Sequence, residues 1–131
     1  MHMETVISYI LHYEDHFRVV VQEQLKIESD EKIQARRKQL TQAEKRIAEL
    51  ERLFVKIYED NAKGKLSDER FSMMSGNYEA EQKKLRMDVV ELQKNIEEQE
   101  RQNERLEKFI QKAKHYQDLN SLTPDALRDM V

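Results

Sequence analysis

The residues with the clearest potential for chemistry are two histidines four positions apart, in the segment His12-Tyr13-Glu14-Asp15-His16. On a helix this spacing places both imidazoles on one face, where they could share a zinc ion, as in zinc proteases. Those enzymes carry a glutamate directly after the first histidine, where this chain has Tyr13. The sequence offers no obvious third ligand either. We therefore expect no metal site and interpret the pair as exposed helical histidines.

Carboxylates and hydroxyls offer no better catalytic site. Glu97, Glu98 and Glu100 are interspersed with lysine and arginine, which is typical of a solvated helix without a pocket. Six serines show no nucleophile elbow or paired base, and capping or surface positions account for them: Ser8, Ser29, Ser67, Ser72, Ser75 and Ser121. Cysteine is absent, so no thiolate nucleophile or cysteine-ligated metal is possible. The sequence predicts no catalytic residue, no metal ligand and no cofactor within this chain.

The amino-acid composition limits the architectures that the chain can adopt. Charged residues make up 37% of the 131 positions and hydrophobic residues 38%, with only two glycines and one proline. So few turn-forming residues favour a small number of long helices with a narrow apolar seam. The net charge is −3 with both signs mixed, and the densest basic run, residues 36–38, has acidic neighbours, which argues against direct DNA binding. There is no apolar run of roughly 20 residues for a bilayer and no secretory signal, so we expect a cytoplasmic protein without a membrane partner.

Apolar residues recur at alternating intervals of three and four, the spacing of a coiled-coil seam. The first series is Ile33, Arg36, Leu40, Ala43, Ile47, Leu50, Phe54 and Ile57. The second is Phe71, Met74, Tyr78, Gln82, Leu85, Val89, Leu92, Ile96, Gln99, Asn103, Leu106, Ile110 and Ala113. Each series lies on a single helix face, so the sequence predicts two long helices that pack along one narrow seam.

The segment between the two series carries the signals for a reversal near residues 61–67. Gly64 suits the left-handed conformation that ends a helix. Ser67 suits the N-cap of the next helix, and Leu66 with Phe71 occupies the two positions of a hydrophobic staple. The second helix must then run back along the first, with facing positions whose numbers sum to about 132. This register places Leu50 near Gln82, Phe54 near Tyr78, Ile33 near Gln99 and Ser29 near Asn103, so part of the seam is polar, which specifies register or marks local fraying.

We therefore predict an all-α fold: a long antiparallel two-helix coiled-coil hairpin. Residues 4–28 form an apolar helical segment at its base, residues 29–119 the hairpin, and residues 120–131 a short, truncated terminal helix, with Thr123 as N-cap and Pro124 at its first position. The helix either bends or continues unbroken around residues 28–30. Residues 1–3 resemble cloning residues, and both ends suggest a piece of a larger protein.

Apolar side chains gather around the predicted turn, where a hairpin has little core of its own. They are Tyr58, Leu66, Phe71, Met73 and Met74. Some must close the end of the hairpin, which is the favoured role for Phe71. The others could form a small adhesive patch for another subunit. These five residues are the predicted protein-interaction site.

Three blocks around the turn resemble the C-terminal region of large serine recombinases, the site-specific recombinases of phages and integrative or transposable elements. The blocks are Leu53–Asn61, Gly64–Phe71 and Tyr78–Gln82, and the later Lys108–Ile110, Tyr116 and Leu122–Pro124 are also similar. The resemblance covers most of the chain from about His12 onward. The turn block is its specific part, since generic coiled coils seldom share such a string.

The resemblance implies a non-catalytic coiled-coil arm that projects from a zinc-ribbon DNA-binding domain of a bacterial or phage recombinase. In that family the arms of different subunits contact each other, support synapsis of two DNA-bound dimers and help decide between integration and excision. The implied partners are another copy of the arm and an accessory directionality protein, with DNA bound only through other domains. Zinc and the catalytic serine are expected only in domains outside this sequence.

Two other interpretations stay open at this point. The hairpin could be a rod-like spacer or adaptor from an unrelated cytoplasmic protein, which the neighbouring coding sequence of the parent gene would reveal. A metal-dependent hydrolase would need zinc retained through His12 and His16, which metal analysis would detect.

Overall fold

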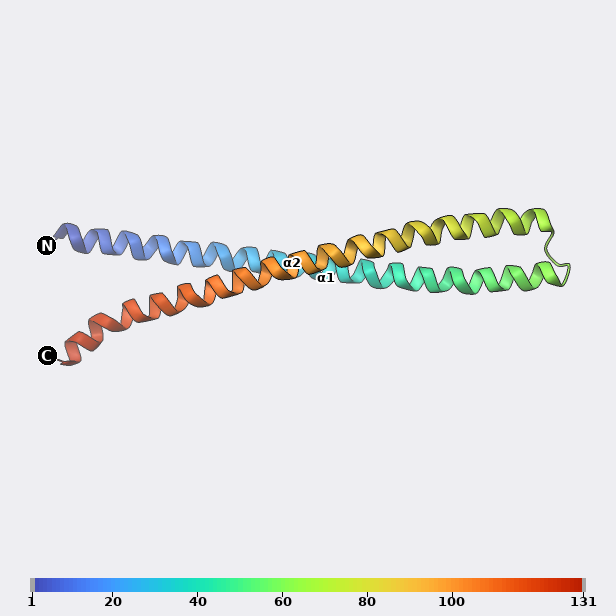
Figure 1. Ribbon diagram of the computed structural model, residues 1–131. Coiled ribbons are helices and arrows are strands. Elements are labelled where there is room, and N and C mark those ends of the chain that lie inside the picture. Colours follow the sequence, from blue (N-terminus) through green and yellow to red (C-terminus); the bar gives the residue numbers. More distant parts are fainter. Residues whose placement is uncertain (1, 131) are drawn as a thin grey trace. The chain divides into compact units, whose positions relative to one another are not determined.

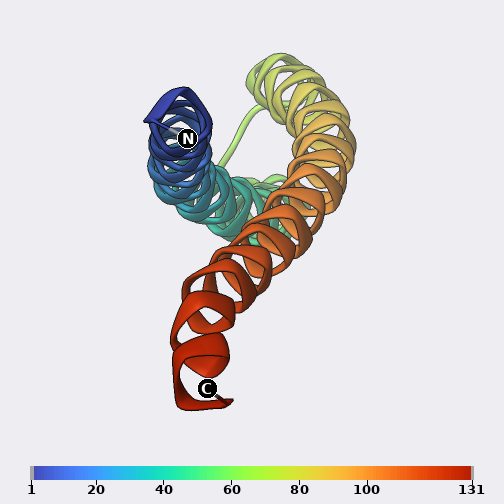
Figure 2. The ribbon, with the colours of Figure 1, turned by 90° about the vertical axis from the view of Figure 1, so that its left-hand side faces the viewer.

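The computed structural model describes residues 2–130 of the chain, and it describes the side chains of residues 13–116, 118 and 119. Two helices, α1 (His2–Ala62) and α2 (Asp68–Met130), account for nearly all of this length, and residues 2–130 contain no strand. Figures 1 and 2 show helical ribbon throughout both helices, joined by a short turn. The predicted all-α hairpin is therefore confirmed.

The chain divides into two compact units, each built from one part of α1 and one part of α2. Unit 1 comprises Met1–Lys32 with Gln99–Val131, and unit 2 comprises Ile33–Glu98. The predicted base segment (4–28) and the first residues of the predicted hairpin (29–119) thus fall together in unit 1. Glutamate, lysine, glutamine, arginine and leucine dominate both helices, and these residues lose little side-chain freedom in a helix. In proteins most helical stability comes from packing of an apolar face rather than from propensity, so we expect the buried seam to stabilise both helices.

The seam of unit 2 lies where the alternating spacing predicts it. Ile33, Ala43, Leu50 and Ile57 of α1 and Ile96 of α2 are buried, with Leu50 wholly shielded from solvent. The remaining predicted positions are half-buried: Arg36, Leu40, Ile47, Phe54, Phe71, Met74, Tyr78, Gln82, Leu85, Val89 and Leu92. A single narrow line of contact therefore carries the hydrophobic stabilisation of this unit.

Contacts between the helices of unit 2 fix their register. The Gln82 side chain donates to the carbonyl of Ile47 (3.2 Å) and to Oε2 of Glu51 (2.9 Å), two residues that flank Leu50. Arg46 and Glu81 form an ion pair across the seam, with Nη2 and Oε2 3.0 Å apart. Gln82 thus lies beside Leu50 as predicted, which confirms the antiparallel register at this level.

The seam of unit 1 is more polar. Val19 of α1 and Ile110 of α2 are buried at about the same level of the hairpin. Ten residues further along α1, Ser29 is also buried and accepts a hydrogen bond from Nε2 of Gln99 at 2.8 Å. Nδ2 of Asn103 donates to Oδ1 of Asp30 at 2.6 Å. Ser29 therefore pairs with Gln99, about half a heptad from its predicted partner. The predicted polar stretch is confirmed as a hydrogen-bonded layer in regular helix rather than a frayed segment.

Both helices are longer and less interrupted than predicted. α1 continues without a break through residues 28–30, which settles the choice between a bend and a continuous helix. The short terminal helix predicted for residues 120–131 is not a separate element, because α2 continues to Met130 and includes Thr123 and Pro124. The fixed φ of proline is compatible with a helix, although its ring removes one backbone hydrogen bond and crowds the carbonyl four residues earlier. The helix-start signals at Thr123 and Pro124 do not interrupt α2.

Candidate interaction site at the turn

The end of α1 is closed by backbone hydrogen bonds from the residues of the turn. Gly64 has a positive φ of 76°. Its N–H donates to the carbonyl of Asn61 (3.1 Å), and the N–H of Lys65 donates to the carbonyl of Asp60 (2.8 Å). This is the Schellman arrangement, which satisfies carbonyls that a helix end would otherwise leave unpaired. The predicted role of Gly64 is confirmed.

Ser67, three residues after Gly64, caps the start of α2. Its Oγ accepts a hydrogen bond from the N–H of Arg70 at 3.2 Å, and its carbonyl accepts one from the N–H of Phe71 at 2.8 Å. Asp68 and Glu69 occupy the first turn, where negative charge is favourable. Leu66 and Phe71 are both half-buried at the two staple positions. The structure therefore confirms the prediction that Ser67 is the N-cap of α2.

Asn61 connects the two helix ends, a role that the sequence did not reveal. Its Nδ2 donates to the carbonyl of Leu66 at 3.1 Å and to Oδ1 of Asp68 at 2.7 Å. One side-chain amide thus ties the last turn of α1 to the first turn of α2. The only signal in the sequence is an asparagine three residues before the helix-ending glycine. The turn is consequently a rigid element with its own hydrogen-bond network.

The two glycines should respond in opposite ways to the same substitution. Gly64→Ala places a Cβ on a residue at φ 76°, so we expect the free energy of unfolding to fall by about 1–2 kcal/mol. Gly76 lies inside α2 and an added Cβ would meet nothing within 4 Å, so Gly76→Ala should raise that free energy by about 0.5–1 kcal/mol. Urea unfolding followed by circular dichroism measures both. Equal effects of the two variants would show that Gly64 is not needed for the turn.

Three aromatic rings close the hairpin next to the turn. The ring of Phe71 lies 6.3 Å from the ring of Phe54 and 6.3 Å from that of Tyr58, tilted by 47° and 62°. Tilted rings at this separation are favourable beyond the area they bury. Phe71 is half-buried at the centre of this cluster. Its predicted closing role is confirmed, and Phe54, predicted only as a seam residue, belongs to the same cluster.

The five predicted interaction residues separate into two groups. Phe71, Leu66 and Met74 are half-buried and contribute to the hairpin itself. Tyr58 and Met73 keep 61% and 62% of their surface exposed. The structure brings Tyr58 against Phe71, whereas Met73 is exposed on the first turns of α2. The residues with free apolar surface for a partner are therefore Tyr58 and Met73.

The charges around the turn are balanced. Residues 56–70 contain four basic side chains (Lys56, Lys63, Lys65, Arg70) and four acidic ones (Glu59, Asp60, Asp68, Glu69). Nζ of Lys56 lies 3.1 Å from Oδ1 of Asp60, so part of this charge is paired locally. A second copy of the same surface would meet no net repulsion here. The exposed apolar area at the turn is therefore compatible with self-association.

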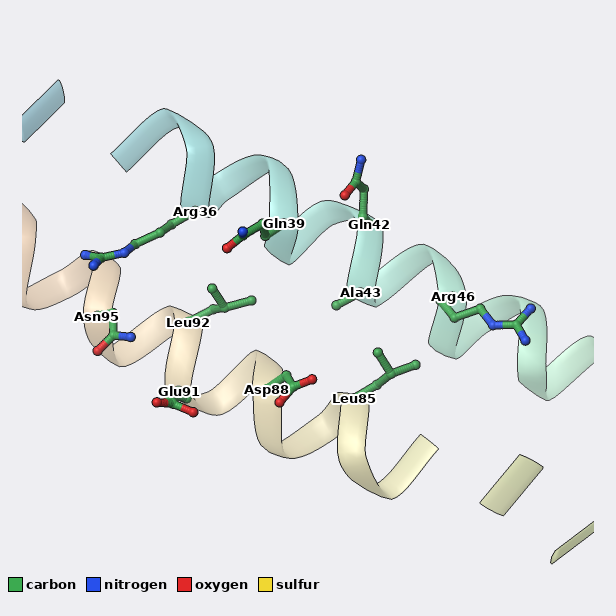
Figure 3. Close-up of a pocket in the computed structure, with 10 residues that line it drawn as sticks. All are labelled: Arg36, Gln39, Gln42, Ala43, Arg46, Leu85, Asp88, Glu91, Leu92 and Asn95. Carbon is green, nitrogen blue, oxygen red and sulfur yellow. The ribbon is translucent and has the colours of Figure 1, made fainter. Parts of the chain in front are cut away.

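An open groove runs along the packed helices of unit 2. It is lined by Arg36, Gln39, Gln42, Ala43, Arg46, Leu85, Asp88, Glu91, Leu92 and Asn95. Figure 3 shows Ala43, Leu85 and Leu92 between the two helices and Gln42 directed away from α2. Its lining has no serine, threonine, tyrosine or histidine, so it lacks a nucleophile with a partner base. The groove is therefore the surface channel that two packed helices leave beside their seam.

Arg46, at one end of this groove, links two acidic side chains. It pairs with Glu81 across the seam and with Oε1 of Glu49 at 2.8 Å on its own helix. The hydrogen bonds to Glu81 raise the pKa of Arg46 above its ordinary value, since they stabilise the charged guanidinium. Arg46 therefore stays charged at any physiological pH. Its role is to orient the helices, and its half-exposed position makes it a weak contributor to stability.

The described residues show neither a metal-ligand cluster nor a membrane span. Among the side chains that the structure describes, no three histidine, aspartate or glutamate residues gather as a metal site. His16 is exposed, and the side chain of His12 lies outside the described residues. Within the same limits, neither helix combines the length and the apolar character that crossing a bilayer requires. Comparison with known proteins gave no match to a protein-family model, a curated protein or a solved structure.

Proposed function

We propose that this chain is the non-catalytic coiled-coil arm of a large serine site-specific recombinase from a bacterium or phage. The arm contacts another copy of itself through its turn end, supports synapsis and helps control the direction of recombination. The family assignment is based on the resemblance of the blocks around the turn, Leu53–Asn61 and Gly64–Phe71. DNA and zinc would be bound by other domains of the parent protein, in the cytoplasm.

The observation that carries the proposal is exposed apolar surface on a rigid, charge-balanced turn. Tyr58 and Met73 are exposed, although both lie within ten residues of Gly64. Aromatic and methionine side chains are enriched in the centres of protein interfaces. The cap at Ser67 and the bridge from Asn61 hold the turn in one conformation, so little entropy is lost on docking. These features favour the turn end as the contact surface.

A single contact of this size should be weak. Two exposed side chains bury far less area than the roughly 1,200 Å² of a stable interface. A recombinase would present several arms at once, and tethering raises the effective concentration to the millimolar range for short linkers. Weak contacts also allow the arms to separate when the direction of the reaction changes. An accessory directionality protein would act by occupying or freeing this same surface.

The experiment is a comparison of two matched double variants. Tyr58→Glu with Met73→Glu should weaken self-association by about tenfold or more, because it places charge in the contact. The control is Met87→Glu with Val90→Glu, which changes two equally exposed apolar residues of α2 away from the turn. Sedimentation equilibrium at millimolar chain concentration gives the dissociation constants, and circular dichroism checks helicity. If both variants associate like the unmodified chain, the turn is not the contact surface.

The parent gene tests the family assignment separately. A resolvase-type serine domain and cysteine pairs encoded upstream would support the recombinase arm. Their absence would leave a rod-like spacer or adaptor as the function of the hairpin, even if its turn self-associates.

A further inference from the structure

The part of α1 in unit 1 carries two lines of residues at coiled-coil spacing. The first line faces α2 and consists of Val19, Gln22, Lys26 and Ser29, which are buried or half-buried. It is mostly polar, and upstream of Val19 its next position is Asp15. This line therefore accounts for little of the apolar content of the segment.

The second line holds most of that apolar content. It consists of Tyr13, Phe17, Val20, Gln24 and Ile27, at successive intervals of four, three, four and three residues. In the sequence the same spacing continues upstream to Ile10, Val6 and Met3. At about 100° per residue, the positions from Tyr13 to Ile27 lie on a face roughly 80–160° away from Val19. We name Tyr13, Phe17, Val20 and Ile27 the second seam.

The second seam is open to solvent. Tyr13, Phe17, Val20 and Ile27 retain 71%, 60%, 49% and 52% of their surface. Exposed apolar residues scattered singly are ordinary, but these four lie in one line at seam spacing, interrupted only by Gln24, and form an apolar stripe. From Tyr13 to Ile27 the stripe extends over about 21 Å of helix. Alternating spacing of three and four is the pattern into which the side chains of another helix interlock, so the surface fits a helix.

The charges around the second seam indicate which kind of helix would bind there. Residues 13–31 contain six acidic side chains (Glu14, Asp15, Glu23, Glu28, Asp30, Glu31) and two basic ones (Arg18, Lys26). Glu14 and Glu28 lie on one flank of the second seam. On the other flank, Glu23 is already paired with Lys114 of α2 (2.7 Å) and Asp30 with Lys26 (3.9 Å). A second copy would place acidic flanks against acidic flanks, which is unfavourable. A helix with lysine or arginine beside its apolar line would find opposite charge at Glu14 and Glu28.

We propose that the second seam is the docking site for a basic amphipathic helix of a partner protein. The apolar line of that helix would cover Phe17 and Val20, and its lysines or arginines would approach Glu14 and Glu28. This site lies in unit 1 and does not depend on the turn or on the recombinase assignment. It differs from the turn in charge as well, because the turn is balanced and the second seam is acidic.

The test uses two synthetic helical peptides about three heptads long with the same apolar line, one flanked by lysine and one by glutamate. Binding to the full chain is measured by fluorescence anisotropy. We expect the lysine peptide to bind at least about tenfold more tightly than the glutamate peptide, with an affinity that falls as salt rises. Phe17→Glu with Val20→Glu should reduce its binding about tenfold or more. Met87→Glu with Val90→Glu should leave it unchanged.

A second pair of variants separates the charge of the flanks from the apolar line. Glu14→Gln with Glu28→Gln keeps the second seam intact, so it should weaken binding of the lysine peptide about threefold or more and reduce the salt dependence. Equal binding of both peptides, or unchanged binding to the Phe17 and Val20 variant, would overturn the proposal. Loss of self-association in that variant, with no effect of the turn variant, would identify a second copy as the occupant and would also overturn it.

Discussion

Leu50→Ala should lower the free energy of unfolding by about 3 kcal/mol, the largest loss expected from one substitution in the hairpin. Leu50 is wholly buried in the seam of unit 2, between the two residues that Gln82 contacts. The truncation removes apolar surface from the only shielded line of the unit and leaves a cavity that two helices can close only in part. Urea unfolding followed by circular dichroism at 222 nm measures the change.

Val90→Ala is the matched control for this prediction. Val90 lies on the same hairpin but is exposed, so removing its methyl groups should change the free energy of unfolding by less than about 0.5 kcal/mol. If the two variants lose the same stability, the seam is not where the helices are packed.

Asn103→Leu should act in the opposite direction and raise the free energy of unfolding by about 1–2 kcal/mol. Among the described side chains, Oδ1 of Asn103 is buried without a hydrogen-bond partner. Its Nδ2 bonds only to Asp30, which is exposed and can be solvated instead. Leucine would replace an incompletely satisfied amide with apolar surface at a seam position. Thermal and urea unfolding of the full chain measure the gain.

Gln102→Leu controls for the general effect of adding leucine to α2. Gln102 is the exposed neighbour of Asn103, so this variant should change stability by less than about 0.5 kcal/mol. A loss of stability in Asn103→Leu would mean that the bond to Asp30 outweighs the cost of the buried acceptor. The polar layer would then be a stabilising element rather than one that fixes register.

The seam and the turn could be predicted because each depends on local rules. A spacing of three and four residues specifies a helix face wherever it occurs, so every predicted seam position from Ile33 to Ile57 is at least half-buried. Gly64 and Ser67 are the residue types that helix ends require. Both helix boundaries at the turn follow from these two residues.

Other features depend on which residues meet in space, and the sequence does not encode them in any local pattern. The bridge from Asn61 to Asp68 forms only once the turn has closed. The ring contact between Phe54 and Phe71 and the shift of Ser29 toward Gln99 depend on the offset between the helices. Thr123 and Pro124 have the types of a helix start, yet α2 continues through them.

The candidate surfaces were only partly predictable for the same reason. The five apolar residues near the turn were found by type and position, but only the packing separates exposed Tyr58 and Met73 from half-buried Phe71. The second seam is present in the sequence as an unusually wide apolar arc over residues 4–27. Its division into one line toward α2 and one toward solvent requires the burial of Val19 and the exposure of Phe17.

The most direct test of the arm as a docking element is a distance between two turns. The chain has no cysteine, so Lys63→Cys in two copies joined by a flexible linker accepts one nitroxide label at each turn. If the turns dock, pulsed electron resonance should give a population of label distances within about two helix diameters, on the order of 25 Å. Addition of Tyr58→Glu and Met73→Glu should remove that population. A broad distribution without short distances in the parent pair would contradict turn-to-turn docking.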